Sequence, residues 1–226
     1  MRPASLLLKL GVLVPVVYFG VLLIGGYLTP GFNHFTQYAS ELGMAGKPAA
    51  QMFNYGIIAA GGLAIAAAPG VLFGMKNLGA NILWALLAAV CLAAWGVSFV
   101  YAGLYPMPNP LHAGPVTVMG LGLGLGLMAI PAARFMFLGV ADRSDLGGVK
   151  SLLILSVLSM IGLMLVMFNV GGMDLVDKSN VGLWQRGYSL AAIPWIGLAC
   201  LGLDQALGRR SKRTRDPMRD VVFGDS

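Results

Sequence analysis

Long apolar stretches separated by short polar segments dominate this sequence. Six of them reach the length of about 20 residues that a helix needs to cross the hydrocarbon core of a bilayer. They cover residues 5–28, 51–75, 78–104, 114–140, 149–171 and 182–207. A bilayer core offers the backbone no water, so each stretch is expected to be helical. The pattern predicts an all-α fold, a six-helix transmembrane bundle in one domain over residues 1–208.

Composition supports a membrane protein. Hydrophobic residues make up 58% of the chain and charged residues only 11%, with a mean hydropathy of +0.79. These values lie outside the range of soluble domains. The first apolar stretch is too long for a removable signal peptide and is expected to be the first transmembrane helix. Cys91 and Cys200 both fall inside predicted spans, which favours buried thiols over a disulfide framework.

The distribution of Lys and Arg predicts the orientation. Of the 15 Lys and Arg residues, only Lys47, Lys178 and Arg186 fall on the side away from the two termini, which leaves 12 on the side of the termini. This bias predicts cytoplasmic termini and an external first loop in a cell inner membrane. The basic tail, 209–226, is expected to be disordered and to lie near anionic lipid. Its basic run lacks the interleaved aromatic residues that stack on bases, so no nucleic-acid partner is predicted.

The first external loop, residues 31–54, is the longest polar interruption between two spans. A short interfacial helix is expected from a cap at Asn33 to Gly43. At the helical period, His34, Gln37 and Glu41 share one face of it, and apolar residues occupy the other. The alternative interpretation is a solvated loop with a hydrogen-bonded histidine.

The fourth predicted span is rich in glycine. Gly120 with Gly124, and Gly122 with Gly126, form GxxxG pairs. Such pairs let helices cross closely, because small residues allow neighbouring backbones to approach. The span is therefore expected to pack tightly within the bundle or to form a homo- or hetero-oligomer.

Arg186 is the most informative polar residue. It lies inside the sixth span, where a guanidinium must reach the interface or pair with a carboxylate. The external acids are Glu41, Asp174 and Asp177, and we expect Glu41 to be the partner. One interpretation is a structural clamp of the first loop on the last helix. The other is a cavity open to the outside, with His34 or His112 available for proton transfer or ligand binding. The candidate ligand-binding residues are Ser40, Glu41, Asn54, Tyr101, His112 and Arg186.

Metal and cofactor motifs are not found. The histidines and acids are scattered and lack a close ligand spacing such as HxxxH. No serine-centred elbow, P-loop or dinucleotide fingerprint occurs, because the glycines of the fourth span follow no strand. We therefore predict no metal site and no cofactor.

Four short motifs resemble the DUF998 family of bacterial and archaeal membrane proteins. They are Ser40-Glu41-Leu42-Gly43, Phe53-Asn54-Tyr55-Gly56, Tyr105-Pro106 followed by His112, and Gly182-Leu183-Trp184-Gln185-Arg186 with Trp195. The resemblance implies that Ser40, Glu41, Asn54, His112 and Arg186 act together. It also implies a second histidine a few residues after His112, where this chain has Val116 to Met119. The family has no known function. A more distant similarity to six-helix Frag1/DRAM-like proteins implies lipid-related roles.

These observations lead to four functional hypotheses. The first is an external polar pocket that binds a lipid headgroup or a small molecule, with membrane lipids as partners. The second is an enzyme acting on a lipid or lipid-linked substrate, with Glu41 and His112 as acid and base and Arg186 as an anion clamp. The third is a small transporter. The fourth is a subunit that packs on partner helices through its GxxxG face.

Overall fold

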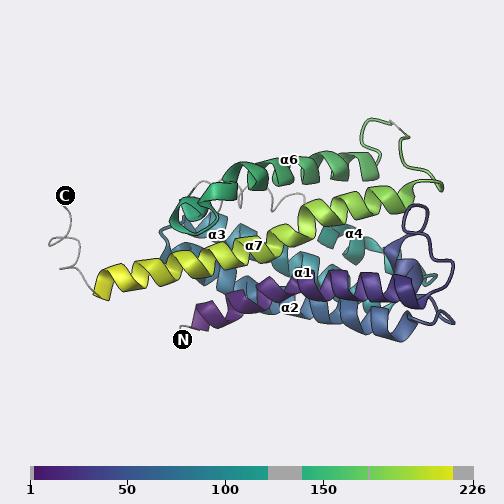
Figure 1. The fold of residues 1–226 in the computed structure, drawn as a ribbon, viewed down its shortest axis with the longest axis horizontal. Helices are drawn as coiled ribbons and strands as arrows, with labels where there is room; N and C mark the ends of the chain where they lie inside the picture. The colour runs from purple at the N-terminus through teal and green to yellow at the C-terminus, as the bar shows by residue number, and fades with distance from the viewer. Residues whose placement is uncertain (1–2, 122–138, 173, 216–226) are drawn as a thin grey trace.

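The computed structural model of the chain describes residues 3–121, 139–172 and 174–215 (Figure 1). Within these residues the fold is all-α, as predicted. The α-helices are α1 (Pro3–Leu28), α2 (Ala50–Asn77), α3 (Ile82–Leu104), α4 (Pro115–Leu121), α6 (Lys150–Met167) and α7 (Val181–Arg215). Short 3-10 helices lie between them: η1 (Ala39–Gly43), η2 (Pro110–Ala113), η5 (Ala141–Arg143) and η6 (Gly147–Val149).

Five of these helices, α1, α2, α3, α6 and α7, are long and apolar enough to cross a membrane. Large apolar side chains such as Val16, Leu23 and Leu83 are 66%, 65% and 70% exposed on their outer surfaces. Such exposure suits a hydrocarbon solvent. The chain is therefore an integral membrane protein. Of the fourth predicted span, 114–140, the structure describes residues 114–121, which include α4, and residues 139–140, and the rest lies outside the described residues.

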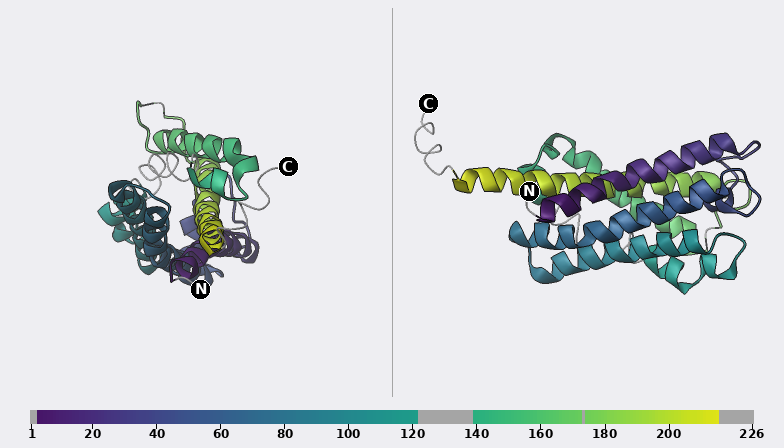
Figure 2. Two further views of the ribbon diagram at one scale, coloured as in Figure 1. Left: turned by 90° about the vertical axis from the view of Figure 1, so that its left-hand side faces the viewer. Right: turned by 90° about the horizontal axis from the view of Figure 1, so that it is seen from below.

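Helix α7 occupies the middle of the bundle. It lies between α6 on one side and α1 on the other, while α2 packs on α1 and α3 (Figures 1 and 2). Small residues permit the closest crossings. A Cβ added to Gly61 of α2 would lie 2.5 Å from the carbonyl oxygen of Gly96 in α3, and one added to Gly11 of α1 would lie 2.4 Å from Cys200 Sγ in α7. Because lipid tails are as apolar as the helix surfaces, the helices are held together by close packing of their backbones and not by the hydrophobic effect.

The first residues of α1 and the last residues of α7 lie at the same end of the bundle, which we call the terminal end (Figure 1). The first loop and η2 lie at the opposite end, which we call the loop end. At the terminal end, Arg143 Nη1 donates to the carbonyl oxygen of Leu78 at 3.3 Å and so joins η5 to the turn between α2 and α3. Which end faces the cytoplasm stays a prediction.

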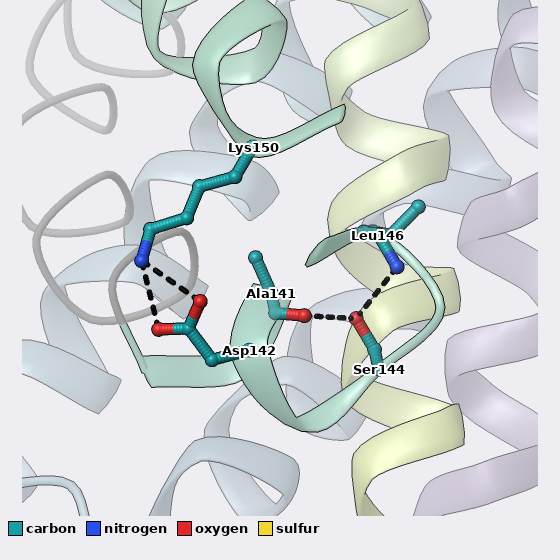
Figure 3. Close-up of polar contacts among 5 residues, drawn as sticks. All are labelled: Ala141, Asp142, Ser144, Leu146 and Lys150. Atoms are coloured by element: carbon teal, nitrogen blue, oxygen red, sulfur yellow. Dashed lines mark hydrogen bonds and ion pairs between the residues drawn. The ribbon is translucent and has the colours of Figure 1, made fainter. Parts of the chain in front are cut away.

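A compact turn leads into α6 at the terminal end (Figure 3). Lys150 Nζ lies 2.8 Å from Asp142 Oδ1. Ser144 Oγ donates to the carbonyl oxygen of Ala141 at 3.1 Å and accepts from the N–H of Leu146 at 3.3 Å. These bonds satisfy the turn's own polar groups, while Ala141 and Leu146 pack in the buried core and the N–H of Asp145 donates to Gln205 Oε1 of α7 at 3.0 Å.

Helix α7 continues beyond the predicted end of the sixth span. It stays helical to Arg215, whereas the sequence pattern predicted a disordered tail from residue 209. Two contacts hold the extension to the bundle: Arg209 pairs with Asp145, and Arg210 Nη1 donates to the carbonyl oxygen of Asn77 at the end of α2. Residues 216–226 lie outside the described residues.

The predicted interfacial helix from Asn33 to Gly43 is wrong in its first part. One helical bond forms, from the N–H of Gln37 to the carbonyl oxygen of Asn33, but regular helix is confined to the 3-10 helix η1, Ala39–Gly43. Two side chains compete for the backbone. Asn33 Oδ1 accepts from the N–H of Phe35 and Gln37 Oε1 accepts from the N–H of Asn33, both at 2.8 Å. Local side-chain bonds of this kind displace a helix.

Candidate functional site at the loop end

The first loop rests directly on the beginning of α7. The N–H of Leu183 donates to the carbonyl oxygen of Phe35 at 2.9 Å. A Cβ added to Gly182 would lie 2.5 Å from the carbonyl oxygen of His34 and 2.6 Å from that of Gln37. Only glycine fits this contact, because both neighbours are backbone atoms. The loop is therefore clamped to the last helix through its backbone.

Gln185 joins the loop to the interior of the bundle. Its Oε1 atom accepts from the N–H of Ala39 and from Arg186 Nη1, both at 2.7 Å. Its carbonyl oxygen accepts from Ser189 Oγ at 2.9 Å. The Tyr18 hydroxyl lies 2.9 Å from Ser189 Oγ. Because the Ser189 hydroxyl donates its proton to the Gln185 carbonyl oxygen, the Tyr18 hydroxyl must be the donor to Ser189 Oγ. These hydrogen bonds form a chain from α1 to the first loop.

Arg186 lies beneath the first loop. Its Cζ atom is 5.7 Å from the centre of the Phe32 ring, within cation–π range. Nη1 is bonded to Gln185, but Nε and Nη2 are buried and have no hydrogen-bond partner among the residues that the structure describes. Nε and Nη2 form one side-on edge of the guanidinium, the edge that receives two oxygens of a carboxylate or phosphate in parallel. An intact anion-binding edge is thus buried and unused.

Glu41 is engaged within its own loop. Oε1 accepts from the N–H of Tyr38 and Oε2 from Gln37 Nε2, both at 2.8 Å. The expected direct ion pair with Arg186 does not form: across the described ranges the ion pairs are those of Lys150 and Arg209 at the terminal end. The physical reason is that both carboxylate oxygens of Glu41 already accept hydrogen bonds at the start of η1. Glu41 still acts electrostatically on the guanidinium.

The other two external acids are also held locally. Asp174 Oδ1 accepts from Asn169 Nδ2 at 2.7 Å. Asp177 Oδ1 accepts from the N–H and the hydroxyl of Ser179 at 2.7 and 2.6 Å, and these bonds lower the pKa of Asp177 from its ordinary value. Each acid therefore stabilises the segment before α7, and neither occupies the free edge of Arg186.

His34 contacts α1 and lies in the electric field of Arg186. Its Nε2 atom is 2.6 Å from where a Cβ on Gly26 would be, and its ring stands edge-on to Phe32 at 4.9 Å. Burial lowers the pKa of His34 from its ordinary value, and the positive charge of Arg186 lowers it further. Both effects favour the neutral imidazole.

Ser40 and Asn54 connect the first loop to its other neighbours. Asn54 Nδ2 of α2 donates to the carbonyl oxygen of Gly43 at 2.9 Å, which closes the end of η1. Ser40 Oγ donates to Met107 Sδ at 3.1 Å and so reaches the segment after α3. Both residues have positions that fit a role in holding the loop.

His112 belongs to a separate cluster. Its Nδ1 atom lies 2.9 Å from the carbonyl oxygen of Tyr105 and 3.2 Å from that of Ala102, so Nδ1 carries the proton. Tyr101 packs on Tyr105 with ring centres 4.6 Å apart. Within the described part of the chain, no hydrogen bond or ion pair joins His112 to Glu41 or Arg186. The structure thus brings Glu41 and Arg186 near each other and leaves His112 with α3.

The described residues contain no group of three or more His, Cys, Asp or Glu side chains that could hold a metal ion. Gly120 belongs to the GxxxG pairs for which close packing or oligomer contacts were predicted. It packs within the chain, because a Cβ there would lie 2.3 Å from Ser98 Cβ in α3. Gly122, Gly124 and Gly126 lie outside the described residues.

Three contributors to this site were not singled out from sequence. Gln185 was passed over for its charged neighbour, although a polar residue so close to Arg186 in a span is itself a signal. Gly26 carries no distinguishing pattern in a glycine-rich chain, and Gly182 opens one of the four motifs without the motif indicating that this glycine contacts the first loop.

The fold and the site define an α-helical integral membrane protein with a polar, loop-covered end. A protein family described as "Protein of unknown function (DUF998)" matches residues 12–202. The chain belongs to this DUF998 family, as its motifs had indicated. No curated protein and no solved structure matches it.

Proposed function

We propose that this membrane protein binds an anionic group, the phosphate or carboxylate of a lipid headgroup or of a small molecule, on the side-on edge of Arg186. The observation that carries the proposal is that Nε and Nη2 are buried without a partner while Nη1 is bonded. A buried unsatisfied donor costs about 1–3 kcal/mol, and more when it is charged. A ligand with two oxygens would remove this cost.

The surroundings of Arg186 keep the edge in place. Gln185 fixes Nη1, and its Oε1 atom is itself fixed by the N–H of Ala39. The Phe32 ring lies against the guanidinium. A guanidinium held in one orientation loses little further freedom when an anion binds. These contacts support a binding role beyond a purely structural one.

We further propose that the loop end faces the outside of the inner membrane. The cationic side chains described at the terminal end include Lys76, Arg143, Lys150, Arg209 and Arg210, whereas Lys47, Lys178 and Arg186 belong to the loop end. Cytoplasmic loops carry the excess of Lys and Arg in membrane proteins. The ligand would then enter from the external leaflet or from the external solution.

The test compares Arg186→Lys with a matched control, Arg209→Lys, at the other end of the bundle. Both keep the charge, but only the first removes the side-on edge. Each protein is extracted in copolymer discs with its native lipids, and the bound lipids are identified by mass spectrometry. A second arm measures binding of inorganic phosphate to the delipidated protein by calorimetry.

We expect Arg186→Lys to lose the bound anion, with a fall in affinity of about tenfold or more, because a charged hydrogen bond contributes about 1.5–3 kcal/mol. Arg209→Lys should bind as the unchanged protein does. Loss of a lipid alone identifies a headgroup ligand, and loss of phosphate binding alone identifies a soluble one. Identical lipids and identical phosphate affinity in both variants would refute the proposal.

A further inference from the structure

We propose that an anion held by Arg186 and a proton on His34 bind cooperatively, so that the site takes up the two together. The inference rests on the proposed function, because it describes how that same site is regulated. It makes anion binding stronger at acidic pH.

His34 and Arg186 both contact one aromatic ring, that of Phe32. Phe32 lies 5.7 Å from Arg186 Cζ and 4.9 Å, centre to centre, from the His34 imidazole. His34 is also pressed on Gly26 of α1, and its carbonyl oxygen contacts Gly182 of α7. The imidazole is therefore held beside the guanidinium by contacts with two helices.

The titratable groups that act on His34 or on Arg186 come from three elements. Helix α7 contributes Arg186, whose charge acts on His34. The loop contributes Glu41 and α1 contributes Tyr18, and both act on Arg186. At the point of contact α1 itself presents Gly26, which does not titrate. Burial lowers the pKa of His34, and the charge that acts on the imidazole in addition is the positive one of Arg186.

The sign of the coupling follows from this positive charge. An anion on Arg186 offsets the positive charge, so the pKa of His34 is higher in the complex than in the free protein. A group that gains proton affinity on ligand binding must strengthen that binding as it becomes protonated. The affinity for the anion is lowest above the pKa of His34 in the complex. It rises as the pH falls, and it levels off below the pKa of His34 in the free protein.

A phosphodiester is the appropriate probe, because its charge stays constant over the range in which histidine titrates. Affinity is measured for dimethyl phosphate in solution and for phosphatidylglycerol in nanodiscs, at about pH 8 and about pH 5. The unchanged protein is compared with His34→Gln, which cannot titrate there. Glu41→Gln is the matched control, because Glu41 is the other acid–base group near the site.

We expect affinity to rise about threefold to tenfold between the two pH values, as a shift of up to one unit in the pKa of a single group requires. The rise should be absent in His34→Gln and present in Glu41→Gln. A rise that persists in His34→Gln, or one that is absent from the unchanged protein, overturns the inference. Binding that depends on Arg186 but not on pH overturns this inference alone, whereas the absence of Arg186-dependent binding at both pH values overturns the proposed function as well.

A second measurement does not need the His34 variant to fold well. The chain has two histidines, so NMR spectra show two imidazoles, and the His112 signals serve as an internal control. On addition of dimethyl phosphate, the pKa of His34 should rise, whereas the signals of the His112 ring should not move. A His34 titration that is identical with and without the probe refutes the coupling.

Discussion

The contact between Gly182 and the first loop makes the sharpest prediction about stability. Replacing Gly182 with alanine adds one methyl group where the ideal Cβ lies 2.5 Å from the carbonyl oxygen of His34, 2.6 Å from that of Gln37 and 2.8 Å from the carbonyl carbon of Phe35. All three neighbours are backbone atoms. The change therefore cannot be accommodated by rotating a side chain.

The size of the effect follows from these distances. An ordinary contact needs 3.4 Å, so the loop and the helix must separate by about 0.9 Å. That separation stretches two hydrogen bonds, from the N–H of Leu183 to the carbonyl oxygen of Phe35 and from the N–H of Ala39 to Gln185 Oε1. Overpacking of this kind typically costs about 1–3 kcal/mol. Higher helix propensity offsets part of it, since alanine is favoured over glycine by about 1 kcal/mol inside a helix.

The assay is reversible unfolding in mixed detergent micelles with added SDS, with Gly62→Ala as the control. Gly62 lies on the exposed face of α2, and a Cβ there meets nothing within 4 Å. We expect the Gly182 variant to lose free energy of unfolding and the Gly62 variant to keep or gain it. Faster tryptic cleavage after Lys47 in the first variant would show that the loop has moved. Equal stability of the two variants, with equal cleavage, would refute the reasoning.

Three further predictions concern the hydrogen bonds around the loop. Tyr18→Phe and Ser189→Ala should show a coupling of about 0.6 kcal/mol in a double-mutant cycle of unfolding, the average for such bonds inside membrane bundles; additive effects would contradict the 2.9 Å bond between them. Asn54→Ala should lower the free energy of unfolding by about 1 kcal/mol, because the carbonyl oxygen of Gly43 loses its donor, and an unchanged unfolding curve would argue against that bond. Gln185→Leu should weaken anion binding more than Tyr18→Phe does, because it releases Arg186 Nη1, which calorimetry with phosphate would detect.

Much of the fold follows from hydrophobic length alone. The predicted starts and ends of the first, second and last spans agree with those of α1, α2 and the beginning of α7 within two residues. The predicted third span begins four residues before α3, because Leu78 and Ala80 are apolar but belong to a turn in which Gly79 has a positive φ of 94° and Asn81 caps α3. Hydropathy indicates which stretches of the chain lie in the membrane. It does not report backbone angles, and a turn depends on a few of these angles.

The candidate site shows where sequence reasoning stops. Charge and topology place Glu41 and Arg186 at the same end of the bundle, and their electrostatic interaction agrees with that. Charge and topology do not reveal that Gln37 and Tyr38 donate hydrogen bonds to the two carboxylate oxygens of Glu41. Pairing predicted from opposite charge assumes that each group lacks a nearer partner, and the turn before η1 supplies two.

The separation of these two charges is also what leaves the side-on edge of Arg186 without a carboxylate among the described residues. A carboxylate in direct contact would occupy the side-on edge of Arg186 and make the guanidinium structural. A carboxylate held back by its own loop still lowers the electrostatic cost of burying the guanidinium, because Coulomb interaction acts over several ångströms in a medium of low dielectric constant. It leaves Nε and Nη2 unbonded. By the same reasoning, the nearby negative charge disfavours a doubly charged ligand, so the edge should prefer a phosphodiester or a carboxylate to a phosphate dianion.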